Sequence, residues 1–143
     1  MNGFREIKHT ADIGLEVHAN SIEKLFIFAL NGYYKLALFD NYSSSVASEF
    51  NFSLIETNYE DLLITFLSEL NYLLMVKNQV INPIHSIEIL RNNHKIFLDF
   101  KGQLNNLVNP DKDITTEIKA VTYHQVKVTE DDGIFKTKIF FDI

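Results

Sequence analysis

Apolar and polar residues alternate over residues 11–18, close to the N-terminus. One face of this segment would carry Ala11, Ile13, Leu15 and Val17. The opposite face would carry Asp12, Gly14, Glu16 and His18. Because successive side chains of a strand point to opposite faces, the pattern predicts a half-buried strand whose Asp12 points away from the core. Residues 4–8 predict a shorter strand directly before it.

Two later segments repeat their apolar residues at the spacing of an amphipathic helix. The first covers residues 22–38 and follows Ser21, whose hydroxyl can accept a hydrogen bond from a backbone N–H of the first turn. The second follows Asn58, which is also typical of a helix N-cap, and runs to about Val76. Its apolar stripe is wider. We therefore predict two helices, of which the second is better buried.

Polar breaks and apolar alternation divide the rest of the chain. We predict loops at residues 40–48 and 102–113, and an acidic turn at residues 130–133. Strands are predicted over residues 50–55, 84–90, 95–100, 117–128 and 135–141. Asn92 and Asn93 tolerate the positive φ angles of a tight turn, so the strands on either side of them should form a hairpin. In residues 117–128 neither face is cleanly apolar, which indicates a central strand or a strand with a bulge.

This order of elements predicts one α+β domain over residues 1–143. Helices and strands are mixed without a strict β-α-β-α order, and the C-terminal part is all strand. The expected architecture has two layers, with one mixed or largely antiparallel sheet and two main helices on one face. A chain of 143 residues suits a single domain.

Composition narrows the classes of function. The chain has no cysteine, which excludes disulfides, zinc fingers, iron–sulfur clusters and thiol nucleophiles. Its net charge is −6 and its lysines are scattered without a basic run, so we expect no strong direct binding of nucleic acid. No apolar run approaches the roughly 18 residues of a membrane helix, and the N-terminus does not resemble a signal peptide. We therefore expect no membrane partner and a cytoplasmic location.

The end of the chain offers candidate metal ligands. The side chain of Asp142 lies next to the terminal carboxylate of Ile143, and adjacent anions repel unless a cation or donors lie between them. If the fold brings Asp12 close, three carboxylates meet, and such hard oxygen ligands suit Ca²⁺, Mg²⁺ or Mn²⁺. The simpler interpretations are a solvated Asp12 and a frayed C-terminus. The apolar Phe140 and Phe141 argue against fraying.

The late segment Lys119-Ala120-Val121-Thr122-Tyr123-His124 carries further polar side chains. Taken alone, Thr122 and His124 are more typical of structural hydrogen bonding than of catalysis. The chain has no Gly-x-Ser-x-Gly nucleophile elbow, no Gly-x-x-x-x-Gly-Lys-Ser/Thr phosphate loop and no dinucleotide fingerprint. No catalytic residue is therefore predicted.

Three segments follow one another along the chain: His9-Thr10-Ala11-Asp12-Ile13-Gly14, the late segment Lys119 to His124, and Phe141-Asp142-Ile143. Together and in this order, they resemble the archease family. The two predicted helices are also similar to the family's helices in residues 21–26 and 61–70. The resemblance runs nearly end to end. It departs from the family's Gly-Glu segment after Gly102, where this chain has Gln103-Leu104-Asn105-Asn106.

The resemblance implies an accessory protein of the RtcB-type tRNA-splicing RNA ligase. Such a protein is not itself an enzyme. It promotes guanylylation and turnover of the ligase and widens the range of nucleotides that the ligase accepts. The family's metal site implies Asp12, Asp142 and Ile143 as ligands of a divalent cation, with Ca²⁺ as first choice and Mg²⁺ or Mn²⁺ as alternatives. Lys119 corresponds to a position expected to matter for activating the ligase, and further candidates for that role are His9, Thr122 and His124.

Two other functions stay open on the residues alone. A metal-dependent phosphoester hydrolase could use the same carboxylates, but the sequence offers no evident general base beside a nucleophile. A non-catalytic interaction protein without metal would leave the carboxylates solvated.

Overall fold

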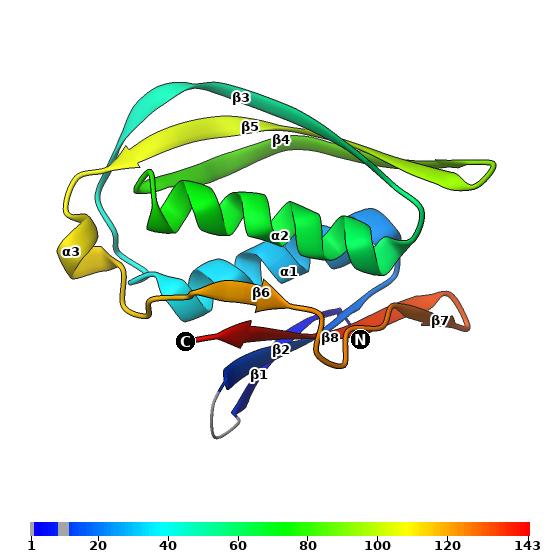
Figure 1. The fold of residues 1–143 in the computed structure, drawn as a ribbon. Helices are drawn as coiled ribbons and strands as arrows, with labels where there is room; N and C mark the ends of the chain where they lie inside the picture. Colours follow the sequence, from blue (N-terminus) through cyan, green and yellow to red (C-terminus); the bar gives the residue numbers. More distant parts are fainter. Residues whose placement is uncertain (1, 9–11) are drawn as a thin grey trace.

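The computed structural model describes residues 2–8 and 12–143, and Figure 1 shows its fold. The helices are α1 (Ile22–Ala37), α2 (Tyr59–Met75) and α3 (Pro110–Asp113). The strands are β1 (Gly3–Lys8), β2 (Asp12–Ala19), β3 (Ser44–Glu56), β4 (Gln79–Asn92), β5 (Lys95–Leu107), β6 (Ala120–Thr122), β7 (Thr129–Asp131) and β8 (Ile134–Asp142). Residues 9–11, including the candidate His9, lie outside the described residues.

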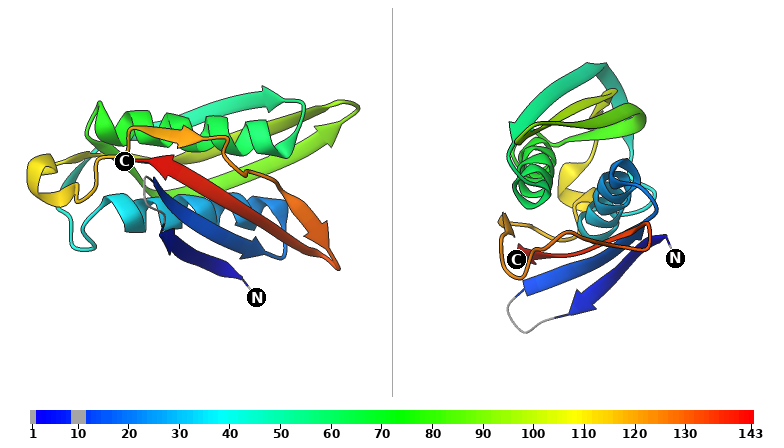
Figure 2. Two further views of the ribbon diagram at one scale, coloured as in Figure 1. Left: turned by 60° about the horizontal axis from the view of Figure 1, so that its bottom comes forward. Right: turned by 90° about the vertical axis from the view of Figure 1, so that its right-hand side faces the viewer.

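The strands form two antiparallel sheets. The terminal sheet has the order β1-β2-β8-β6, with β7 also pairing β8, and the long-strand sheet has the order β3-β5-β4. The predicted α+β class and the antiparallel pairing are confirmed, whereas the single sheet in two layers is wrong. Helices α1 and α2 lie between the two sheets, as the right view of Figure 2 shows.

The width of the apolar surface on the helices explains this third layer. In α2 the consecutive residues Leu62, Leu63 and Ile64 are all buried, so the helix needs cover on more than one side.

Both predicted helix caps are confirmed. Ser21 Oγ accepts from Lys24 N at 3.1 Å, and Asn58 Oδ1 accepts from Asp61 N at 2.8 Å. Within the described residues, no helix is both long and apolar enough to cross a membrane.

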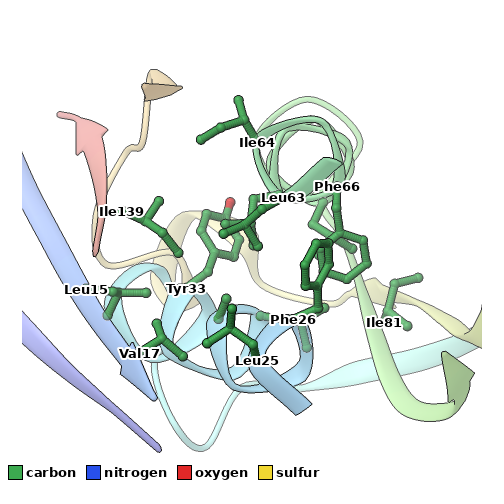
Figure 3. Close-up of a cluster of buried hydrophobic side chains, with 14 of the residues drawn as sticks. Leu15, Val17, Leu25, Phe26, Tyr33, Leu63, Ile64, Phe66, Ile81 and Ile139 are labelled. Atoms are coloured by element: carbon green, nitrogen blue, oxygen red, sulfur yellow. The ribbon is translucent and has the colours of Figure 1, made fainter. Parts of the chain in front are cut away.

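The core lies around the two helices (Figure 3). Phe66 of α2 is fully buried, and its ring centroid lies 5.5 Å from that of Phe26 on α1. Phe66 also contacts Phe52 of β3 at 6.0 Å and Phe100 of β5 at 5.3 Å. On the other side, Leu15 of β2 and other inward residues of the terminal sheet complete the cluster. One side chain thus joins both helices to the long-strand sheet.

Two predicted loops are in part strands. Strand β3 already begins at Ser44, inside the loop predicted at residues 40–48. Ser44 pairs with Leu107, so β5 covers residues 102–107 of the loop predicted at residues 102–113. Pairing between strands satisfies the backbone of these polar residues, and a local pattern does not reveal the partner. Gly102 has a structural role here, because a Cβ on it would lie 2.5 Å from Ile81 Cγ2.

The predicted strand over residues 117–128 is also wrong in extent and position. Only Ala120–Thr122 form a strand, at the edge of the terminal sheet, before a turn that includes Gln125 at φ 54°. A positive φ interrupts a strand, because strand residues have strongly negative φ. The chain then rejoins the sheet as β7, which forms a hairpin with β8 around Asp132 and Gly133.

Candidate functional site

Asp12 and Asp142 are direct partners in the pairing of β2 with β8. Directly opposite residues of an antiparallel pair share a face, with Cβ atoms about 4.5–5.5 Å apart. Both side chains therefore project from the outer face of the terminal sheet, away from the helices. Asp12 is half-buried and Asp142 is exposed. The fold thus brings together two carboxylates from opposite ends of the sequence, as the metal hypothesis requires.

Strand β6 completes this end of the sheet. Ala120 pairs with Asp142 from the other side, and the backbone N–H of Lys119 donates to the Asp142 carbonyl at 2.8 Å. The Asp142 backbone is therefore held between two strands, while Ile143 follows it with a side chain 48% exposed. Lys119 is exposed. Because Ala120 shares the face of Asp142, the Lys119 side chain turns to the opposite face of the sheet, towards α2.

The other two candidates make local contacts. The hydroxyl of Thr122 accepts a hydrogen bond from the backbone N–H of His124 at 3.2 Å, so it stabilises the turn after β6. The ring of His124 packs edge-on against Phe140, with centroids 5.4 Å apart.

The donor set suits a hard cation. Two carboxylates on neighbouring strands offer the oxygen ligands that Ca²⁺, Mg²⁺ and Mn²⁺ prefer. Among the described residues there is no group of three or more His, Cys, Asp or Glu side chains around one point. Main-chain oxygens, such as those of Ile143, or water would have to complete the coordination shell.

Gly14 allows the ring of Phe140 to approach the backbone of β2 closely. The two residues pair, and a Cβ on Gly14 would lie 2.8 Å from two ring carbons of Phe140 and 3.1 Å from the carbonyl oxygen of Ile139. Phe140 belongs to the outer face, yet it is only 2% exposed. Its ring therefore covers Gly14. This covered pair separates the carboxylates of Asp12 and Asp142 from the remainder of the outer face.

We expect Gly14→Ala to lower the free energy of unfolding by about 1–3 kcal/mol, because the added methyl group overpacks this contact. In an open strand position the same change would raise stability, since glycine weakens a strand. Urea denaturation of Gly14→Ala, Phe140→Leu and the double variant checks this. The double variant should lose less than the sum of the two single changes, and strict additivity would contradict the contact.

The whole chain matches a known family. A family model described as the archease protein family (MTH1598/TM1083) matches residues 4–143. The chain belongs to the archease family. It is similar to the protein archease of Pyrococcus furiosus, with 30% identity over 149 residues and all of both chains covered. The protein archease of Methanosarcina mazei is 27% identical over 140 residues, which cover 98% of this chain and 95% of the relative.

Solved structures show the same fold. Protein 1598 of Methanobacterium thermoautotrophicum aligns over all of both chains with a TM-score of 0.80 and 22% identity. An archease of Thermotoga maritima, described as a possible chaperone, aligns with a TM-score of 0.60 and 26% identity. That alignment covers 97% of this chain and 96% of the Thermotoga chain.

In this archease, Lys119 also lines a groove of about 850 Å³ between the C-terminal half of α2 and residues 110–121. The buried Asn71 supports its wall, because its Nδ2 donates to the carbonyl of Ile118 at 3.1 Å. The hydroxyl of Tyr33 on α1 donates to Asn71 Oδ1 at 2.5 Å. Burial raises the pKa of Tyr33 well above its usual value, so the hydroxyl keeps its proton as a donor. These two bonds hold the segment before Lys119 against both helices.

A second feature of this archease, a group of basic side chains, was not predicted from the sequence. Lys127, Lys136, Lys138 and Arg5 gather with His18 around Glu16 on the outer face of the terminal sheet. Arg5 donates to the Glu16 carboxylate at 2.8 Å, and this hydrogen bond holds the pKa of Glu16 below its usual range. The alternation of Lys136 and Lys138 was visible in the sequence, but its partner strand was not.

Proposed function

We propose that this archease activates an RtcB-type RNA ligase. It promotes guanylylation and turnover of the ligase and widens the range of nucleotides that the ligase accepts, and it is not itself an enzyme. Membership of the family over residues 4–143 supports the proposal. The observation that carries it further is the direct pairing of Asp12 with Asp142 on an outer face, where a partner can reach both carboxylates.

The residues have separate roles in this proposal. Asp12 and Asp142, with main-chain oxygens of Ile143, hold a divalent cation, of which Ca²⁺ is the first choice. When bound, such a cation neutralises charge that develops on phosphoryl oxygens. The pairing of Asp142 with both β2 and β6 keeps the carboxylates in place before the ligase docks. Lys119, whose backbone pairs with Asp142, contacts the ligase from the groove beside α2.

The proposal is tested with the RtcB-type ligase of the same organism, divalent cation and labelled GTP. We expect the intact chain to raise the rate at which the ligase becomes guanylylated, and to raise the number of RNA joining events per ligase. The chain alone should take up no label, because the guanylylated residue belongs to the ligase. An unchanged rate at saturating amounts of the chain would overturn the proposal. Hydrolysis of a phosphoester by the chain alone would favour the hydrolase instead.

A further inference from the structure

The basic side chains around Glu16 form a cleft in the terminal sheet. In the register of β2 and β8, Glu16 lies opposite Lys138 and His18 lies opposite Lys136. Lys136 also pairs with Thr129 of β7. The loop after β6 adds Gln125 and Lys127, and the cleft encloses about 320 Å³. Four separate segments of the chain thus contribute to one concave surface.

The charge of this cleft is opposite to that of the whole chain, which has a net charge of −6. Glu16 is already paired with Arg5 at 2.8 Å and with His18 at 3.2 Å. For Lys127, Lys136 and Lys138, no ion pair within 4.0 Å is recorded in the described part of the chain. Like charges gathered on one sheet face repel each other, so an anionic ligand would stabilise this arrangement.

The lining of the cleft favours phosphate over an acidic protein surface. None of its described lining residues is apolar. The buried centre of a protein–protein interface, in contrast, is mainly apolar. Lysine ammonium groups, the Thr129 hydroxyl and the Gln125 amide are the kinds of donors that bind the phosphates of nucleic acids. We propose that this cleft binds the phosphate backbone of a single RNA strand, without selecting its sequence.

The position of the cleft gives this binding a direction. Glu16 and Lys138 lie four residues from Asp12 and Asp142 on the same face, a distance of about 13 Å along the strands. Asp131, one row further in the β7–β8 hairpin, limits the basic surface at the other end. A strand bound in the cleft can therefore continue towards the carboxylate pair. This inference goes beyond the activation of a ligase, because the isolated chain should bind RNA.

The test measures the anisotropy of a labelled single-stranded RNA of about 12 nucleotides with the isolated chain, between about 50 and 200 mM salt. The variant K136S/K138S removes two exposed cations of the cleft. The matched control K95S/K101S removes two exposed cations of β5, in the other sheet. Both variants change the net charge equally, and thermal denaturation verifies that both are folded.

We expect K136S/K138S to weaken RNA binding about tenfold at the lowest salt. It should also reduce the slope of log affinity against log salt by about 1.4, because each phosphate contact on a single strand contributes about 0.7. The control should bind within about twofold of the parent. Tripolyphosphate should compete with the RNA for the parent chain.

Three results would overturn the proposal. The first is no RNA binding by the parent at low salt. The second is an equal loss in K95S/K101S, which would mean that diffuse charge and not the cleft attracts RNA. The third is lysine-dependent binding of tripolyphosphate without binding of RNA, which would assign the cleft to a small phosphate compound.

Discussion

Asn in place of Asp12 or Asp142 should remove most of the stimulation of ligase guanylylation while the chain stays folded. Each change keeps the shape of the side chain and removes one of two carboxylates that pair directly across β2 and β8. Removal of a group that only supports a metal ligand typically lowers metal affinity or activity about 10–100-fold. We therefore expect removal of a ligand itself to lower the stimulated rate of guanylylation at least about tenfold. The measurement is the initial rate of guanylylation at fixed ligase and cation.

The matched control is Asp99→Asn, which makes the same chemical change on β5 of the long-strand sheet. Asp99 interacts with the Ser53 hydroxyl on an exposed surface, far in the fold from the carboxylate pair. We expect this variant to stimulate the ligase as well as the parent does. Equal stimulation by all three variants would remove Asp12 and Asp142 from the proposed mechanism.

Thermal stability offers a second measurement on the same variants. Like charges directly opposite each other on neighbouring strands destabilise a sheet. In the absence of a cation, Asp142→Asn should therefore leave the free energy of unfolding unchanged or raise it by about 0.2–1 kcal/mol. A cation that binds only the folded chain raises its melting temperature. Added Ca²⁺ should therefore stabilise the parent and Asp99→Asn, but not Asp12→Asn or Asp142→Asn. A shift in all four proteins would place the cation elsewhere.

Phe66→Ala should cost about 3–5 kcal/mol of unfolding free energy, because the change removes a fully buried ring and leaves a cavity. The ring contacts Phe26, Phe52 and Phe100, so the loss weakens packing in α1 and in the long-strand sheet together. A loss of this size is a large fraction of the stability of a small domain. Urea denaturation followed by circular dichroism provides the measurement.

The control for this prediction is Phe97→Ala on the outer face of β5. Phe97 is 36% exposed, and its row neighbours Ile55 and Leu90 are more exposed still, so little packing is lost. We expect a much smaller decrease in stability than for Phe66→Ala. Similar decreases would show that the layer between the two sheets is not the main core.

The local patterns predicted the helices and several strands well, because periodicity and caps act over a few residues. Ser21 and Asn58 cap the two main helices as expected. The ends of the strands were less accurate. Ser44 and Leu107 belong to strands only because they pair with each other, and their distance in the sequence hides that pairing.

The candidate site was predicted in part. The resemblance singled out Asp12 and Asp142, and the structure places them opposite each other. Thr122 and His124 came from the late segment Lys119 to His124, but the structure shows them in contact with the turn backbone and with Phe140. The register of β2 and β8 decides which side chains meet, and a shift of one residue would move them to opposite faces.

By itself, the sequence determined the α+β class, the two capped helices, the hairpin at Asn92 and Asn93, and the outward orientation of Asp12. Those features depend on hydrophobic period and on local backbone chemistry. Only the tertiary structure decided that the helices separate two sheets, and that scattered lysines gather around Glu16 in an acidic chain. The physical reason is that strand pairing and layer packing join residues without regard to their distance along the chain, and charges and carboxylates acquire their neighbours only through that pairing.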